Sequence, residues 1–582
     1  MTAELVQAAL SDPRAADVRR RVFRQLVESL LYEGAVRTDR DGDEHVVTGI
    51  DRDGQPVRYS FSAVRRFGFG RVGLTSPVLR DGVEAESVTR FLSEVRKSLD
   101  ADPDHLPGFA RELEETLFKD ALSEHLREDP PSTADHDVLE SAITDGHRYH
   151  PTYKSRLGFD VADDIAFGPE FANPLRPLWL AAHRDITEVS GSASLGGDYV
   201  TEQLGTAVEG FHRRIEDAGR DPDDYVLVPV HPWQWRERIA RAFSEQLGRG
   251  ELIPLGDDPD EFLAQQSIRT LTCRDAPERP YLKLSMSMVN TSTSRGLAAH
   301  TVRNAPRITD WLREVVAGDD YLSGELRPIL LGEELGVSVT PEADLLQADT
   351  YGALACIWRE SLHPHLGTGE RAIPFTGLTA CLRDGTPLID AWVRDTGVED
   401  WVRQVVRVSA LPLVHLLCAH GVALESHAQN MALVHVDGKP ERVVLKDFHD
   451  GVRFSREHLA KPAPELAGTP AHHQNRNSFV ETDELSLVTD FLLDAFFFIN
   501  LGELALFLAD HYGFAEQDFW RVVVEEIRGY QRRFPELEAR FELFDLFTPA
   551  IEVEQLTTRR LHPDTELRLH AVPNPLAEVE RC

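Results

Sequence analysis

The residues that could do chemistry most directly stand at both ends of one segment, residues 425–451. Polar side chains begin and end it, and between them two short apolar runs flank an Asp-Gly turn, a pattern that predicts a β-hairpin. Folding at the turn would place Asn430 roughly opposite Asp447, with Glu425 nearby. Mg²⁺ prefers oxygen ligands and often binds through carboxylates and substrate phosphates. The segment therefore predicts a kinase-like Mg-ATP corner, and a hairpin with solvated polar ends is the alternative.

A second candidate is a concentration of cations in an otherwise acidic chain. Residues 145–160 bring together His147, His150, Lys154 and Arg156 with few apolar neighbours. Arg offers forked donors and Lys a point charge, so we expect an anion site for a phosphate or a carboxylate. The alternative is a surface loop whose cations pair with neighbouring Asp or Glu. Zinc is a further option for His147 and His150, but no third ligand has convincing spacing.

Hydroxyl and cationic side chains also follow two strand-like segments, residues 266–272 and 281–295. The first segment carries Ser267, Arg269 and Thr270. The second carries Lys283 and ends in a Thr/Ser-rich run at Arg295. We expect the two segments to form a cradle for a polyanion. Two sheet strands with ordinary Ser and Thr on an exposed face are the alternative.

The bulk composition limits the partners and the setting. The 582 residues carry a net charge of −35, which makes nucleic acid and anionic membrane surfaces poor partners. The five cysteines are far apart and form no CxxC, so no disulfide framework or iron–sulfur cluster is expected and a reduced, cytoplasmic setting fits. The N-terminus does not resemble a signal peptide. Interior carboxylates in the apolar residues 485–509 favour buried helices over a membrane span.

Periodicity predicts an α+β chain that is too long for one core. Helical spacing appears in residues 1–33 and 84–127, around two predicted hairpins in residues 34–62. Breaks near residues 129–133 and 341–346 suggest three domains, residues 1–133, 134–345 and 346–582. We also expect a disordered surface loop at residues 461–477, and helices at residues 305–316, 351–362, 401–420 and 484–545.

Familiar nucleotide and hydrolase motifs are missing from the sequence. It has no GxxxxGK[ST], no strand-linked GxGxxG, no GxSxG and no HExxH. Any ATP site must therefore be built in another way.

The order and spacing of the remaining motifs resemble the IucA/IucC family, the NRPS-independent siderophore synthetases. The resemblance covers about residues 145–570 and rests on GHRYHPTYK (146–154), SIRT (267–270), the Thr/Ser run ending at Arg295, HAQN (427–430) and KD (446–447). It implies a cupped hand with thumb, fingers and palm, which we assign to the three predicted domains, with mainly antiparallel sheets and the kinase-like hairpin in the palm. It also implies a cytoplasmic ligase of iron acquisition that uses ATP and Mg²⁺ to adenylate a carboxylic acid, and then joins the acid to an amine or alcohol with release of AMP and pyrophosphate.

The resemblance also assigns roles by matching position. ATP would be bound by Ser267, Arg269, Thr270, Lys283, Arg295 and His427, with His150 and Lys154 near the nucleotide or substrate. The acid would be bound by Thr291, Arg295, His427 and Gln429. His427, Arg295 and Lys283 would be catalytic, and Glu425, Asn430 and Asp447 would hold the metal.

Several questions stay open at this point. Citrate or a citrate derivative is the expected acid, and an N-hydroxy-N-succinyl diamine is the main competitor. A phosphotransferase and a non-catalytic siderophore-binding or ferric-reductase protein are alternatives of another class. Homodimers are common in the family. Arg148 replaces a proline that the family commonly shows, and it either points outward or adds a cation near an acidic substrate.

Overall fold

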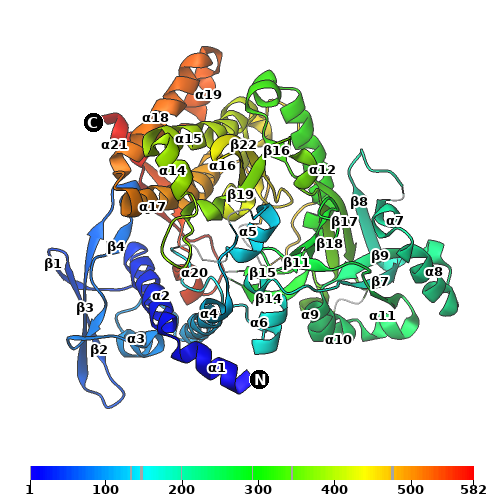
Figure 1. The fold of residues 1–582 in the computed structure, drawn as a ribbon, viewed down its shortest axis with the longest axis horizontal. Coiled ribbons are helices and arrows are strands. Elements are labelled where there is room, and N and C mark those ends of the chain that lie inside the picture. Colours follow the sequence, from blue (N-terminus) through cyan, green and yellow to red (C-terminus); the bar gives the residue numbers. More distant parts are fainter. Residues whose placement is uncertain are drawn as a thin grey trace.

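The computed structural model describes residues 2–131, 134–143, 148–197, 199–290, 293–342, 345–473 and 478–581. Helices and mainly antiparallel sheets follow one another along the chain (Figure 1), which confirms the predicted α+β class.

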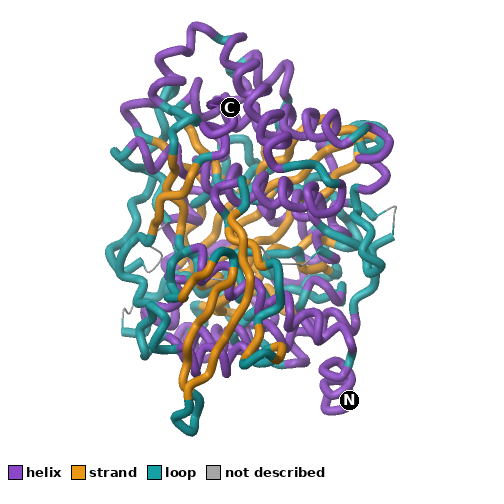
Figure 2. The backbone as a smooth tube through the Cα atoms, turned by 90° about the vertical axis from the view of Figure 1, so that its left-hand side faces the viewer, coloured by secondary structure: helices purple, strands orange, loops and turns teal. Residues whose placement is uncertain are grey.

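The N-terminal segment packs helices against a sheet of short antiparallel strands. Asp12 accepts a hydrogen bond from the Arg14 N–H at 3.0 Å and Pro13 takes the first helical position, so the sequence itself fixes the start of α2. In Figure 2 the molecule is turned so that the side carrying this sheet faces the viewer. The elements are α1 (Thr2–Ser11), α2 (Pro13–Tyr32), β1 (Asp39–Asp41), β2 (Glu44–Ile50), β3 (Pro56–Arg65), β4 (Val72–Leu74), β5 (Leu79–Arg80), β6 (Val83–Glu84), α3 (Val88–Val95) and α4 (Leu106–Leu126).

The middle segment is built on a six-stranded antiparallel sheet in the order β11-β12-β13-β18-β17-β8. Its strands are β8 (Thr187–Gly191), β11 (Phe262–Ala264), β12 (Thr270–Cys273), β13 (Tyr281–Leu284), β17 (Glu333–Val339) and β18 (Ala355–Arg359), and α12 (Ala299–Ala317) packs on β17. Smaller elements surround it: α5 (His136–Ala142), α6 (Val161–Phe167), α7 (Tyr199–Leu204), α8 (Ala207–Asp217), α11 (Ser244–Arg249), the sheet of β10 (Leu252–Asp257), β7 (Leu178–His183) and β9 (Tyr225–Val230), and the hairpin of β14 (Met286–Asn290) and β15 (Thr293–Arg295).

The C-terminal segment surrounds a four-stranded sheet, β16-β22-β21-β19, with helices. The pair β16–β22 is parallel and the other two pairs are antiparallel. The strands are β16 (Ile329–Leu330), β19 (Arg371–Pro374), β21 (Met431–Val436), β22 (Lys439–Leu445), β20 (Val422–Leu424), β23 (Val452–Phe454), β24 (Ala550–Glu554) and β25 (Leu569–Pro573). The helices are α14 (Asp390–Thr396), α15 (Val398–His415), α16 (Leu485–Leu492), α17 (Gly502–Tyr512), α18 (Glu516–Arg533), α19 (Glu538–Leu543) and α21 (Pro575–Arg581), with π-helical turns η6 (Tyr321–Leu326), η9 (Leu416–His420) and η12 (Leu493–Leu501).

The largest hydrophobic core joins the two ends of the chain. It contains Val22 and Phe91 from the N-terminal segment together with Leu433, Phe496 and Val523 from the C-terminal segment. Figure 1 likewise shows β4 beside α17. The N-terminal sheet is therefore held against the C-terminal helices. The two predicted domain boundaries, and the three domains that they define, remain predictions.

Two helices are long and apolar enough to cross a membrane, judged only by length and composition. They are Val398–His420 and Leu485–Tyr512, and 72% and 78% of their apolar windows are buried inside the protein. This burial agrees with the prediction of buried helices around residues 485–509.

One helix prediction is wrong. Residues 351–362 contain β18, which lies between β13 and β17 with all five of its residues buried. A strand buried on both faces reads as a continuous apolar run, and periodicity cannot distinguish such a run from a buried helix. The prediction of a helix at residues 305–316 is confirmed by α12.

The loop that begins at residue 461 is attached to the protein in its described part. Asn304 on α12 donates from Nδ2 to the Ala467 carbonyl at 2.9 Å and accepts from the Ala467 N–H at 2.8 Å. His473 lies near Tyr351, with 3.0 Å between its Nδ1 and the hydroxyl oxygen. This differs from the expected disordered loop up to His473; residues 474–477 lie outside the described residues.

Candidate active site

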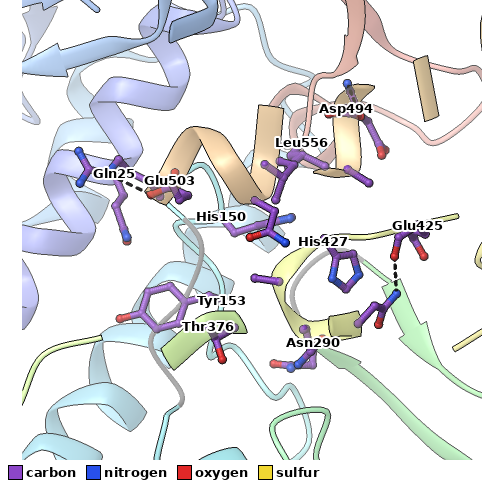
Figure 3. A pocket seen from close by; sticks show the side chains of 18 of the residues that line it. Gln25, His150, Tyr153, Asn290, Thr376, Glu425, His427, Asp494, Glu503 and Leu556 are labelled. Atoms are coloured by element: carbon purple, nitrogen blue, oxygen red, sulfur yellow. Dashed lines mark hydrogen bonds and ion pairs between the residues drawn. The ribbon is translucent and has the colours of Figure 1, made fainter. Parts of the chain in front are cut away.

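A cavity of about 1400 Å³ lies where the three segments meet. Its wall includes residues of α2, the turn before β12, β13, the segments just before and after the hairpin β21–β22, and the helices α16 and α17. Figure 3 shows His150 and His427 near its middle, with Asn290 and Thr376 on one side of His427 and Asp494 and Leu556 on the other.

The predicted hairpin is present, and its register is one residue away from the expected one. Met431 pairs with Leu445, and the Lys446 N–H donates to the Asn430 carbonyl at 3.1 Å. Asn430 therefore faces Lys446 rather than Asp447. The backbone of Asp447 then leaves the strand in the left-handed region, at φ 68°.

Asp447 is held by cations from the central sheet. Lys283 Nζ on β13 lies 2.8 Å from Asp447 Oδ1, and Arg359 on β18 bonds the same oxygen. Burial favours the neutral form of Asp447, but Arg359, Lys283 and His449 together pull its pKa well below the usual value. The hairpin and the sheet are thus joined through one ionised carboxylate.

Hydrogen bonds within the turn before β12 hold the side chains of the SIRT motif, residues 267–270, in position. Ser267 Oγ accepts from the Thr270 N–H at 3.1 Å and donates to Thr270 Oγ1 at 2.8 Å. Arg269 donates to the carbonyls of Arg295 and Gly296, at 2.8 and 3.0 Å. Ile268 between them has φ 68°, which is strained for a β-branched residue. Its buried side chain packs with Trp233 and the β14 methionines, and this packing holds the strained turn.

We call Arg269, Lys283 and Arg295 the cationic cluster. All three side chains line the cavity. Burial lowers the pKa of Lys283 and, with the nearby Arg269, lowers the pKa of Arg295 to about 10. Burial thus leaves the charged forms of these groups less stabilised than in water, and an anion in the cavity would stabilise them.

His427 and Gln429 line the same cavity, from the turn that precedes β21. Burial lowers the pKa of His427 to about 4, so its imidazole is neutral at pH 7 in the ligand-free protein. Thr291, the remaining residue predicted to bind the acid, lies outside the described residues.

The predicted metal residues are close, but they are arranged differently from the expectation. Asn430 Nδ2 donates to the Glu425 carbonyl at 3.0 Å. Burial and the neighbouring Asp450 raise the pKa of the Glu425 side chain to about 8. A second acidic group, which sequence reasoning missed, brings together ligand atoms of Glu333, Asp447 and His449. Glu333 lies more than one hundred positions before Asp447 in the sequence, and His449, two positions after Asp447, has no spacing that marks it as a ligand.

Lys154 and Arg156, two of the cations of residues 145–160, are buried and paired. Lys154 Nζ lies 2.7 Å from Asp120 Oδ1 and 3.4 Å from Glu170 Oε1, and Arg156 pairs with Asp164 and Glu170 at 2.7 and 2.8 Å. Pairing with Asp and Glu is the alternative to an anion site, but these ion pairs lie in the interior rather than on a surface loop. Lys154 and His150 still line the cavity, so their contact with ATP remains a prediction. His147 lies outside the described residues.

Arg148 does not point outward. It lines the cavity, with Nε 3.5 Å from Glu503 and another nitrogen 3.8 Å from Asp510 on α17. The cation that replaces the family's usual proline is therefore matched by carboxylates of the protein.

Sequence reasoning also missed an acidic cluster, which we define as Asp490, Asp494, Glu552 and Glu554. All four line the cavity beside Leu487, Leu556 and Leu569. Burial raises the pKa of Asp490 to about 6, and burial with Glu554 raises that of Asp494 to about 8. The only signal in the sequence was the presence of carboxylates inside an apolar stretch.

The comparisons with known proteins decide the family. A relative named "Citryl-spermidine/3,4-dihydroxybenzoyl-citryl-spermidine:spermidine ligase", from Bacillus anthracis, is 42% identical over 574 residues, covering 96% of this chain and 93% of the relative. The sequence model described as "IucA / IucC family" matches residues 135–380. The chain belongs to the IucA/IucC family. It is an ATP-dependent ligase of siderophore biosynthesis, as predicted.

Solved structures agree with this membership. The crystal structure of the petrobactin biosynthesis protein AsbB from Bacillus anthracis has a TM-score of 0.94 at 40% identity, covering 100% of this chain and 98% of that one. The aerobactin synthetase IucC from Klebsiella pneumoniae has a TM-score of 0.81 at 26% identity, covering 98% and 99%. A second sequence model, described as "Ferric iron reductase FhuF-like transporter", matches residues 399–569. The C-terminal segment of this chain is therefore similar to that model as well.

Proposed function

We propose that this IucA/IucC protein adenylates citrate or a citrate derivative and joins it to a diamine or polyamine. The observation that carries the proposal is the cationic cluster, three cations that line one cavity and whose pKa values are lowered by burial. Bringing ATP and a carboxylate together requires cations that offset the repulsion between two anions.

The first step forms a bond between a carboxylate oxygen and the α-phosphorus of ATP, while the bond to pyrophosphate breaks. Arg269, Lys283 and Arg295 would stabilise the charge on the phosphates, with Ser267 and Thr270 as hydroxyl donors. His427 and Gln429 would orient the acid. In the second step the neutral amine attacks the acyl carbon, AMP leaves, and the amine proton passes to a base. His427 is neutral at pH 7 and can accept it.

The residues fit a magnesium ion. The carboxyl groups of Glu425, Asp447 and Asp450 are close enough to influence one another's pKa, and the pKa of Glu425 rises as burial and this crowding oppose its ionisation. A divalent cation would relieve the crowding. Glu425, Asn430 and Asp447 would hold Mg²⁺, which supplies charge neutralisation for the pyrophosphate leaving group.

The acidic cluster supports an amine with more than one charge. Its carboxylates lie beside leucines, a combination that suits an aliphatic chain carrying ammonium groups. Two relatives point the same way, because the Bacillus anthracis ligase is named for spermidine and a Staphylococcus aureus synthase, 43% identical over 576 residues, is named for an aminoethylcarbamoyl product. A hydroxamate diamine is the second choice of substrate.

We assign a thumb to residues 1–133, fingers to residues 134–345 and a palm to residues 346–582, with hairpin β21–β22 as the kinase-like element of the palm. The mixed helix and antiparallel-sheet fold supports this reading. A cytoplasmic homodimer remains our prediction for the assembled enzyme.

The nucleotide product tests the proposal. The pure protein is incubated with Mg-ATP, a panel of acids that includes citrate, and hydroxylamine as a general nucleophile, while AMP, ADP and pyrophosphate are followed. Acid-dependent AMP and pyrophosphate are expected. Acid-dependent ADP would replace adenylation with phosphoryl transfer, and no nucleotide turnover with any acid would overturn the proposal. Replacing hydroxylamine with spermidine and simple monoamines then tests the amine.

A further inference from the structure

A cluster of metal-ligand type lies outside the cavity wall. Asp319 follows the C-terminus of α12, and His415 and His420 bracket the π-helical turn η9. The imidazole Nε2 atoms of His415 and His420 lie 2.9 and 3.0 Å from the same carboxylate oxygen, Asp319 Oδ2. Residues separated by about one hundred positions in the chain thus direct two nitrogens and one oxygen at a common point.

Two of the three groups, Asp319 and His415, are held in position by a second contact. Asp319 Oδ1 accepts hydrogen bonds from the N–H groups of Tyr321 and Leu322, both at 2.9 Å, which leaves Oδ2 toward the histidines. His415 Nδ1 lies 2.9 Å from the Tyr530 hydroxyl of α18. Such an outer contact on the second ring nitrogen is the usual companion of a metal-binding histidine.

The backbone contributes to the same arrangement. His415 and His420 are five residues apart, and the π-helical turn between them closes hydrogen bonds at that spacing, which brings both rings to one side. Single π-helical turns are uncommon and often occur at functional sites. A second π-helical turn, η6, begins directly after Asp319 and Asp320.

The donor set and its exposure suit zinc. Zn²⁺ binds imidazole nitrogen and carboxylate oxygen in tetrahedral sites. Two neutral histidines and one carboxylate give the ligand set a single negative charge, which would offset part of the charge of the zinc ion. The side chains of His420 and Asp319 are 15% and 17% exposed, so a water molecule can reach the fourth position. We propose that Asp319, His415 and His420 form a zinc site that fastens η6 to η9 and, through Tyr530, to α18.

The competing explanation is a cluster of hydrogen bonds in which both histidines simply donate to Asp319. The variant His420→Gln separates the two, because glutamine keeps an N–H donor for Asp319 but is a poor zinc ligand. His212→Gln is the control, since His212 is an exposed histidine on α8. His449→Gln tests whether zinc is held instead by the acidic group in the cavity.

The experiment equilibrates each full-length protein with Zn²⁺ in a buffer that contains Mg²⁺, removes loose metal and measures bound zinc with the thermal midpoint. We expect about one zinc per chain in the wild type, His212→Gln and His449→Gln, and almost none in His420→Gln. Added zinc should raise the thermal midpoint only where it is retained. Tyr530→Phe should weaken zinc binding about 10- to 100-fold.

Three results would overturn the proposal. The wild type could retain no zinc, His420→Gln could retain as much as the wild type, or zinc could disappear only in His449→Gln. Circular dichroism checks that His420→Gln is folded. If it is not, Asp319→Asn replaces it, because the asparagine oxygen can still accept from Tyr321 and Leu322 while the anionic ligand is lost.

Discussion

The cationic cluster and the acidic cluster belong to the same cavity but are supported in different ways. Lys283 is matched by Asp447, and Arg269 is anchored on two carbonyls of the β15 end. In the acidic cluster, burial and the neighbouring Glu554 raise the pKa of Asp494, and Arg559 pairs with Glu554 at 2.7 Å. The cationic cluster is arranged to bind an anion, whereas the acidic cluster stays partly protonated until it binds a cation.

The cationic cluster would serve the step that all such ligases share, and the acidic cluster would select the amine. Every ligase of this kind must bind ATP and a carboxylate, and rigid, partly neutralised cations do that without large rearrangement. An amine would be recognised by the carboxylates that accept hydrogen bonds from its ammonium groups and by the leucines beside them. We therefore expect changes in the cationic cluster to affect turnover, and changes in the acidic cluster to affect amine affinity.

The largest expected effect comes from the cationic cluster. Arg295→Ala removes a cation of the cavity wall at the proposed meeting point of ATP and the acid, and should lower kcat at least about 10²- to 10³-fold. His427→Ala should have a similar result. Pyrophosphate release measures the rate and circular dichroism checks the fold. Arg52→Ala, at a side chain that is 94% exposed, is the control. Normal turnover, or unfolding of either variant, would contradict the assigned roles.

A buried cation that is fully paired provides the contrast. Lys154→Met leaves Asp120 and Glu170 without one of their partners, and breaking such a buried pair costs about 3–5 kcal/mol. Denaturant unfolding measures the loss. A structural role predicts lower stability with an unchanged KM for ATP at low temperature. A higher KM for ATP in folded protein would add Lys154 to the nucleotide site.

How far the sequence could predict these clusters depends on how local their signals are. Ser267, Arg269 and Thr270 stand within four positions of one another, and two β-prone runs around a turn indicate the hairpin. The partners that complete the site, Glu333 and Arg359, come from strands that pair only in the folded sheet. Asp490 and Glu554 are likewise brought together by tertiary packing. β18 was misread because burial on both faces removes the alternation that marks a strand.

The next effect tests the carboxylate that joins hairpin and sheet. Asp447→Asn removes a proposed metal ligand and the counter-charge of Lys283 and Arg359, so the Mg²⁺ concentration needed for half-maximal rate should rise about 10- to 100-fold. Asp437→Asn, at the exposed turn of the same hairpin, is the control. If Asp447 serves only as an ion-pair partner, stability will fall while the Mg²⁺ dependence stays the same.

The smallest effect distinguishes the two clusters most directly. Asp494→Asn should raise KM for spermidine about tenfold and leave KM for ATP unchanged, because one charge-assisted hydrogen bond to an ammonium is lost. Asp483→Asn, at an exposed position outside the cavity wall, is the control.

The pH dependence gives this variant a second, opposite signature. The pKa of Asp494 is about 8 in the folded protein and near 3.8 when unfolded, so its contribution to stability is complete at low pH and is lost as pH rises through about 8. The asparagine variant should therefore unfold at a higher temperature than the wild type at pH 9. In the wild type, KM for spermidine should fall between pH 6 and 8 as Asp494 ionises, and this trend should flatten in the variant. A variant that is more stable at pH 9 yet binds spermidine normally would confine Asp494 to a structural role, and the amine would then have to be recognised elsewhere in the cavity.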